Sequence, residues 1–155
     1  MLRAQQILTA QEALEQGTVH HTVTLDGDQR YRRRITLTAD DGLEFLLDLP
    51  NAALLRHGDG LRLDDGRIVQ VLAVPEELLE VRARDGHHML QIAWHLGNRH
   101  LEVQIESERI LIRRDHVIAD MLHTLGAEVC EVVEPFTPEA GAYSHHHTGE
   151  HSHDH

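Results

Sequence analysis

The sequence predicts a chain of the α+β class, with an all-β part at residues 1–75 and a mixed part at residues 76–134. Two observations carry this prediction. The dipeptide Asp-Gly occurs four times before residue 67, and it favours tight turns between strands because both residues tolerate positive φ. After Pro75 the spacing of the apolar residues changes, and stretches with helical periodicity alternate with stretches with strand periodicity. Residues 135–155 show neither periodicity.

Between the Asp-Gly turns, the chain alternates apolar and polar residues or is rich in β-branched ones, which is typical of strands. Residues 3–16 are compatible with a short helix. A local basic cluster has two interpretations, the solvated side of a strand or a docking patch for an acidic partner. The predicted strands are Thr18 to Leu25, Arg33 to Ala39, Leu43 to Leu49 and Arg67 to Val74, and the cluster comprises Arg30, Arg32, Arg33 and Arg34.

The mixed part has the order βαββαβ. Its two predicted helices each place four apolar side chains at i, i+3, i+4 and i+7, and therefore on one face. These side chains are Met89, Ile92, Ala93 and Leu96 in the helix of residues 87–96, and Ile118, Met121, Leu122 and Leu125 in the helix that follows Asp115. Strand spacing covers residues 77–84, 100–106, 109–114 and 127–133.

The ends of these helices have recognisable signals. Asp115 is a candidate N-cap, since its carboxylate accepts from exposed backbone N–H groups. Gly97 and Asn98 are predicted to end the first helix, because either residue can take the left-handed conformation. Gly126 ends the second helix. The order predicts a ferredoxin-like domain, in which two helices cover one face of an antiparallel sheet.

Composition excludes several classes of partner. The formal charge of −12 argues against nucleic acid, because phosphate binding needs a basic face, and it suits a protein that handles cations. No apolar run approaches the ~18 residues of a membrane helix, and residues 1–10 lack a signal-peptide pattern. The single cysteine, Cys130, is expected to be a buried apolar side chain in a strand. We therefore expect a cytoplasmic protein without membrane partners.

Histidine is the compositional outlier, with 15 copies in the chain. Six of them lie in the last eleven residues, in a polar segment that is expected to be disordered because it cannot bury enough apolar surface. Glu150 and Asp154 interrupt the histidines, unlike the unbroken run of a purification tag, and add carboxylate ligands. The six are His145, His146, His147, His151, His153 and His155.

The available ligands limit which metal ions could bind. Neutral imidazole binds divalent ions, and a set of nitrogen and oxygen ligands without thiolates indicates nickel, zinc or copper(II). His100 is the main candidate outside the tail, since it follows the first helix among polar neighbours. His116 is a second candidate, at the first turn of the second helix. Surface positions are expected for His87, His88 and His123, and opposite strand faces for His20 and His21.

An enzyme has little support in the sequence. The chain contains no Gly-x-Ser-x-Gly, no glycine-rich phosphate loop and no His-Glu-x-x-His. A catalytic metal is normally held by three rigid protein ligands beside an open position. Here the densest ligands lie in the tail, which favours capture and release of an ion.

Three segments resemble one known family, the urease accessory protein E family of nickel metallochaperones. They are Trp94-His95-Leu96-Gly97-Asn98-Arg99-His100, Arg114-Asp115-His116-Val117, and residues 135–143 before the His-rich end. The resemblance covers essentially the whole chain, and the Gly-Asn-Arg-His segment with the later Asp-His-Val is its most specific part. Some relatives have a histidine where this chain has Arg114.

The resemblance implies a homodimer formed through the ferredoxin-like domain, in which His100 of each chain shares one Ni(II) and the tail histidines add ligands. It implies delivery of nickel to urease apoprotein, with an accessory GTPase as partner, and an N-terminal domain that binds partners. Zn(II) or Cu(II) are further candidate ions. A passive nickel or zinc store without a dedicated recipient, and a metal-dependent hydrolase, are the alternatives.

Overall fold

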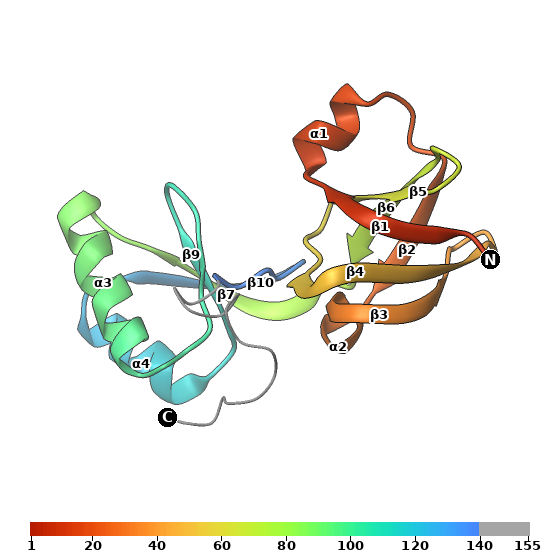
Figure 1. Ribbon diagram of the computed structural model, residues 1–155. Helices are drawn as coiled ribbons and strands as arrows, with labels where there is room; N and C mark the ends of the chain where they lie inside the picture. Colours follow the sequence, from red (N-terminus) through yellow and green to blue (C-terminus); the bar gives the residue numbers. More distant parts are fainter. Residues whose placement is uncertain (140–155) are drawn as a thin grey trace. The chain divides into compact units, whose positions relative to one another are not determined.

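The computed structural model describes residues 1–139, which form two compact units, Met1–Val74 and Pro75–Glu139 (Figure 1). Sheets and short helices occur in both, which confirms the predicted α+β class. The tail histidines lie outside the described residues. None of the helices in residues 1–139 is long and apolar enough to cross a membrane.

The first unit is built on a six-stranded sheet with the order β2-β6-β5-β1-β4-β3. Two pairs, β1 with β4 and β2 with β6, are parallel. Aliphatic side chains alternate towards the core along these strands, and Phe45 is fully buried among them. The strands are β1 (Arg3–Leu8), β2 (His21–Leu25), β3 (Tyr31–Thr38), β4 (Glu44–Leu54), β5 (Gly60–Leu63) and β6 (Ile68–Ala73).

The N-terminal segment differs from its prediction. Residues 3–8 are strand β1 and only Ala10–Glu15 are helical, as α1. The helix starts at Thr9, whose side chain accepts from the Glu12 N–H while the Glu12 carboxylate accepts from the Thr9 N–H. Asp26 makes the same kind of cap with Gln29, so the expected Asp-Gly turn is a one-turn helix, α2 (Gly27–Arg30).

The basic cluster divides into two parts. Arg30 is only 2% exposed, and its Nε donates to the Leu55 carbonyl at 2.8 Å. Arg32, Arg33 and Arg34 are exposed on β3, which lies at the edge of the sheet. Arg30 is therefore part of the packing of the unit, so neither interpretation of the cluster, a solvated strand side or a docking patch, holds for Arg30.

The second unit is an antiparallel sheet of order β10-β7-β9-β8 with two helices. Its elements follow the predicted βαββαβ order, which confirms the ferredoxin-like plan. Both helices contribute to one core, where Ile92 and Leu96 pack with Leu122 and the sheet residues Val81 and Ile112. The elements are β7 (Glu76–Arg82), α3 (Gly86–Asn98), β8 (Gln104–Ile105), β9 (Ile110–Arg113), α4 (His116–Thr124) and β10 (Glu128–Glu134).

A second, smaller apolar cluster in this unit comprises Leu78, Leu111 and Phe136. Phe136 follows β10, is fully buried and lies beneath the Arg113 guanidinium, 4.7 Å from the ring centroid. Residues after the last strand therefore pack on this unit. Cys130 is exposed on the edge strand β10, so its expected burial is wrong.

Candidate metal centre

His100 lies immediately beyond the C-terminus of α3 with a positive φ of 59°. It is the only non-glycine residue with positive φ in residues 1–139. Its N–H donates to the Gly97 carbonyl at 2.9 Å, and the Leu101 N–H donates to the Leu96 carbonyl at 3.3 Å. These bonds satisfy the last carbonyls of the helix, as C-terminal caps do. The helix end thus fixes the backbone of His100.

The helix ends at Asn98, one of the two residues predicted to end it, but the expected left-handed conformation of Gly97 or Asn98 is wrong, because both residues remain helical and the left-handed position falls on His100. Left-handed backbone is unfavourable for residues with a Cβ, although histidine is among the types more often found there. A strained backbone at a candidate ligand is a known feature of functional sites.

The His100 side chain is exposed and has no hydrogen bond or ion pair within residues 1–139. It lines a cavity of about 230 Å³ together with Glu102 and Asp115. Arg113, also in the lining, donates to the Glu102 carboxylate and to Glu76. Both nitrogens of the His100 ring are thus available to a ligand, whereas the two carboxylates of the lining are already bonded, Glu102 to Arg113 and Asp115 to the first turn of α4.

His116 is the first residue of α4 and is exposed. The preceding Asp115 caps the helix, as predicted, by accepting from the N–H groups of Val117 at 2.9 Å and Ile118 at 3.1 Å. Arg114 donates through Nε to the Leu78 carbonyl at 3.1 Å and through its terminal nitrogen to Val132 at 3.0 Å. Arg114 therefore has a structural role in the sheet and leaves His116 without a histidine beside it.

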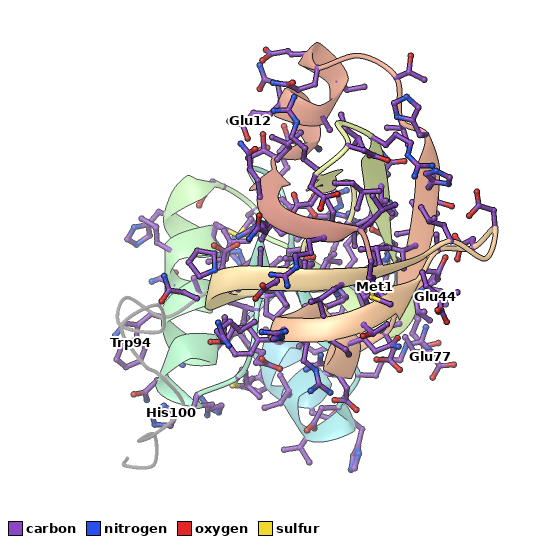
Figure 2. The ribbon with its side chains drawn as sticks, turned by 45° about the vertical axis from the view of Figure 1, so that its right-hand side comes forward. Met1, Glu12, Glu44, Glu77, Trp94 and His100 are labelled. Carbon is purple, nitrogen blue, oxygen red and sulfur yellow. The ribbon has the colours of Figure 1, made fainter. Side chains whose placement is uncertain are left out.

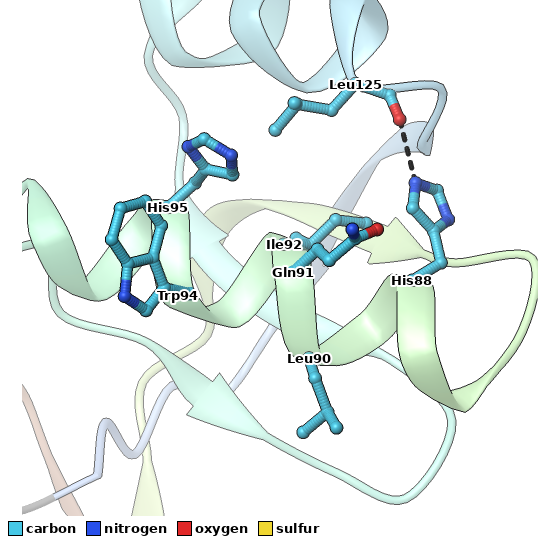
Figure 3. Close-up of a pocket in the computed structure, with 7 residues that line it drawn as sticks. All are labelled: His88, Leu90, Gln91, Ile92, Trp94, His95 and Leu125. Atoms are coloured by element: carbon cyan, nitrogen blue, oxygen red, sulfur yellow. Dashed lines mark hydrogen bonds between the residues drawn. The ribbon is translucent and has the colours of Figure 1, made fainter.

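Two other histidines have structural roles. His88 is only 3% exposed: its Nδ1 accepts from the Arg84 N–H at 3.0 Å, and its Nε2 lies 2.7 Å from the Leu125 carbonyl (Figure 3). The expected surface position of His88 is therefore wrong. His21 is bonded to Asp41 at 2.6 Å, a contact that lowers the pKa of that carboxyl group.

The exposed side of α3 carries two large apolar side chains. Leu90 is 70% and Trp94 64% exposed, and the two are one helical turn apart. They line a cavity of about 430 Å³ together with His95 (Figure 3). The rings of His95 and Trp94 pack edge to face, with 5.1 Å between their centroids. Figure 2 shows the side chains of Trp94 and His100 on the outer side of the helix and its end.

Within residues 1–139, no three histidine, cysteine, aspartate or glutamate side chains gather closely enough to hold a metal ion. Neither His100 nor His116 therefore belongs to a group of three candidate ligands within residues 1–139 of one chain. The sequence motif around His100 predicted His100 as a candidate ligand but did not indicate Glu102 as a neighbour in the cavity. The exposure of Leu90 and Trp94 could have been predicted from the sequence, since both lie outside the apolar stripe that packs on the core.

These features define a two-domain protein, in which a unit built on a six-stranded sheet with two short helices is followed by a ferredoxin-like unit, with an exposed histidine at the end of a helix. Residues 4–74 match the family model "UreE urease accessory protein, N-terminal domain", and residues 76–155 match "UreE urease accessory protein, C-terminal domain". The chain belongs to the UreE urease accessory protein family. It is thus an accessory protein of urease maturation and is not urease itself.

Individual relatives agree with this assignment. The chain is 58% identical over 141 residues to a urease accessory protein UreE of Chelativorans sp. (strain BNC1), covering 86% of this chain and 89% of the relative. It is 56% identical over 128 residues to one of Rhodopseudomonas palustris (strain HaA2), covering 83% of this chain and 60% of that relative. A urease accessory protein UreE 1 of Brucella suis biovar 1 (strain 1330) is 48% identical over 144 residues, covering 93% of this chain and 88% of that relative.

Proposed function

We propose that this protein is a nickel metallochaperone, which binds Ni(II) as cargo and delivers it to urease apoprotein. The observation that carries the proposal is the exposed imidazole of His100, whose backbone the end of α3 holds in a left-handed conformation. Neutral imidazole is a good ligand for nickel. A fixed but accessible ligand suits an ion that must later be released, and membership of a urease accessory family supports urease as the recipient.

A homodimer would supply the remaining ligands. Leu90, Trp94 and Gly97 lie along one row of α3, at i, i+4 and i+7, and His100 follows three residues later. An isologous interface places each residue near the equivalent residue of its partner when both lie close to the two-fold axis. If the exposed apolar row forms that interface, two His100 side chains meet and share one ion.

The tail histidines at positions 145–147, 151, 153 and 155 are proposed as additional ligands, and His116 as a weaker one. The same nitrogen and oxygen ligands would also accept Zn(II) or Cu(II). An accessory GTPase and urease apoprotein are the proposed partners in the cytoplasm, with binding of partners assigned to the N-terminal unit. No catalytic step is proposed.

The alternative function is passive storage of nickel or zinc. The dense histidines of the tail favour it, because a store needs capacity and no specific recipient. The two functions differ in whether the bound ion reaches urease directly.

The test is calorimetric titration of the full dimer with Ni(II), together with activation of purified urease apoprotein. We expect about one tight nickel per dimer from the symmetry argument. His100→Ala should remove this site and urease activation, while much of the weaker tail binding remains. His87→Ala, at an exposed histidine on the same helix, is the matched control and should change neither.

A chain that ends at Tyr143 should lose weak nickel ions and keep its fold and dimer. If His100→Ala retained one tight nickel and still activated urease, the metallochaperone site would be placed wrongly. If the wild-type protein bound nickel tightly but transferred none to purified urease apoprotein, storage would replace delivery as the function.

A further inference from the structure

Glu102 is the carboxylate nearest to His100 along the chain, and it lines the same cavity of about 230 Å³. Two residues of chain separate their Cα atoms by at most about 7 Å. The backbone on each side of Glu102 is held: the Leu101 N–H donates to the last turn of α3 at 3.3 Å, and the Val103 carbonyl accepts from the Glu139 N–H at 2.7 Å. An imidazole and a carboxylate thus line one cavity from a fixed stretch of backbone.

The Glu102 carboxylate is held by a guanidinium that is itself fixed. Arg113 on β9 donates through Nη1 to Oε1 of Glu102, and through Nε to Glu76 at 2.9 Å. Its guanidinium also lies over the Phe136 ring, 4.7 Å from the centroid. Only one oxygen of Glu102 is engaged, and Oε2 accepts no hydrogen bond within residues 1–139. Arg113 therefore orients the carboxylate and leaves one oxygen for a cation.

The charges around this carboxylate suit a cation. Glu102, Glu76 and Arg113 together carry a net charge of −1, and Arg114, the other cation of the lining, is paired with two further glutamates. The Glu102 side chain is 61% exposed, and exposed ion pairs hold their partners weakly. The carboxylate can thus move towards an ion without losing a buried contact. Carboxylates that ligate a metal are in turn hydrogen-bonded by their surroundings.

Asp115, the other carboxylate of the cavity, is less suited to this role. It accepts from the N–H groups of Val117 and Ile118 and so caps α4. Turning it towards an ion would leave these N–H groups without their cap. Glu102 has no such duty to a helix.

We propose that Glu102 is a carboxylate ligand of the ion bound at His100, and that Arg113 is a positioning residue that orients this carboxylate. The inference rests on the proposed nickel function of His100 and deepens it, because it names an oxygen ligand in the folded unit. When two chains place His100 at a two-fold axis, each supplies one imidazole and one carboxylate. Two ligands from each chain agree with the absence of a three-ligand group within residues 1–139.

The first test is calorimetric titration of the full chain with Ni(II). Glu102→Gln keeps the shape of the side chain and removes its charge. It should weaken the tight site about 10–100-fold, the range found when groups that support a metal ion are removed. The melting temperature of the metal-free variant should change little, since the ion pair is exposed. Glu108→Gln, at an exposed glutamate of the same unit, is the matched control and should keep the affinity.

Glu102→His separates a ligand from a structural partner of Arg113. Imidazole coordinates nickel, but a neutral imidazole does not replace the charge of the ion pair with Arg113. The histidine variant should therefore recover the tight nickel affinity that Glu102→Gln loses. If both variants bind nickel equally weakly, Glu102 acts through the ion pair alone and its role as a ligand is overturned.

Arg113→Met tests the positioning role, since methionine still covers the Phe136 ring but donates no hydrogen bond. It should weaken the tight site about tenfold in the wild-type background. In the Glu102→Gln background it should have little further effect, because residues that act through one another are not additive. Equal losses in both backgrounds would show that Arg113 does not act through Glu102.

The outcomes separate this inference from the proposed function. If His100→Ala abolishes the tight site while Glu102→Gln leaves its affinity unchanged, the carboxylate ligand is overturned and the nickel function stands. If His100→Ala keeps the tight site, the nickel function fails at its first step. Loss with glutamine and recovery with histidine at position 102 support the carboxylate as a ligand.

Discussion

His100 combines a candidate ligand with an unfavourable backbone conformation, and the two can be tested apart. A left-handed backbone costs a residue with a Cβ about 1–2 kcal/mol relative to the right-handed form, and glycine avoids this cost. We expect His100→Gly and His100→Ala to lose the tight nickel site equally. The glycine variant should be more stable than the alanine variant by about 1 kcal/mol.

Thermal unfolding of the metal-free variants measures this difference. For a unit of this size, 1 kcal/mol corresponds to about 4–8 °C in melting temperature. Equal melting temperatures would show that the positive φ of His100 carries no strain. A nickel site lost in the more stable variant would also show that misfolding is not the reason for the loss.

At the residue scale, His100 as a nickel ligand stays a prediction, whereas the backbone and hydrogen bonds that hold the histidines differ from those predicted. The motif drew attention to His100, but residue type alone placed the left-handed position at Gly97 or Asn98. His88 and His123 both looked like surface residues on helices. Only the fold brings the Leu125 carbonyl to the ring of His88, and a contact 37 residues away in sequence leaves no local signal.

At the scale of elements, one arginine beside β9 donates hydrogen bonds to β7, to β10 and to the turn before β9. Arg109, which precedes β9, donates to Glu80 of β7 at 2.9 Å, to Glu106 at 2.9 Å and to Glu134 of β10 at 2.6 Å. These bonds raise the pKa of Arg109, which stays charged at any pH of interest. The same bonds lower the pKa of the Glu80 carboxyl group and that of the Glu134 carboxyl group below the usual value for glutamate.

The lowered pKa values predict the pH dependence of this contribution. Because the folded-state pKa of Glu80 and Glu134 is lowered, their contribution to stability is present above the unfolded pKa of about 4.3. It is lost as the pH falls through the folded-state pKa. Arg109→Met should cost about 2 kcal/mol at pH 7, from hydrogen bonds to charged groups, and less at pH 3, which lies below the unfolded pKa.

Denaturant unfolding at pH 7 and pH 3 checks this prediction. Arg82→Met is the control, since Arg82 also bonds to Glu80 but its side chain is 44% exposed, and exposed ion pairs contribute about 0–1 kcal/mol. A cost of Arg109→Met that is the same at both pH values would mean that the methylene packing of the side chain, not its charge, stabilises the three strands.

Elements with regular apolar periodicity and capping residues were predicted well, whereas the N-terminal strand, which lacks both, was not. The helices α3 and α4 were found from their apolar stripes, and Asp115 was found as a cap. Residues 3–8 were assigned to a helix, whereas they form β1 between β4 and β5. The pairing partners of β1 lie 43 to 59 residues further along the chain, and periodicity within a short window does not report such pairing.

At the scale of the whole molecule, the proposed nickel site depends on the number of chains. Within residues 1–139, one chain offers the imidazole of His100 without two further ligand side chains beside it. The exposed apolar row of Leu90 and Trp94 on the same helix gives a reason for a second copy to bind there, since contiguous apolar surface marks interaction sites. Dimerisation and tight nickel binding should therefore be lost together.

Leu90→Glu with Trp94→Glu tests this coupling. Two carboxylates on the apolar row of each chain would face their equivalents across an isologous interface, where like charges and buried unpaired groups oppose association. In light scattering the metal-free variant should be a monomer, whereas we expect the wild type to be a dimer at the same concentration. Its fold should persist, because both side chains are more than half exposed and contribute little to the core of their unit.

In that monomer the tight nickel site should be lost although His100 and the tail are intact. Glu substitutions at two other exposed positions of the same unit, Val117 on α4 and Val133 on β10, are the control for added charge and should keep the dimer. A monomeric Leu90→Glu, Trp94→Glu variant that still bound one nickel tightly per chain would show that His100 and the tail of one chain complete the site. In that case the two-fold axis would serve assembly and have no part in coordination.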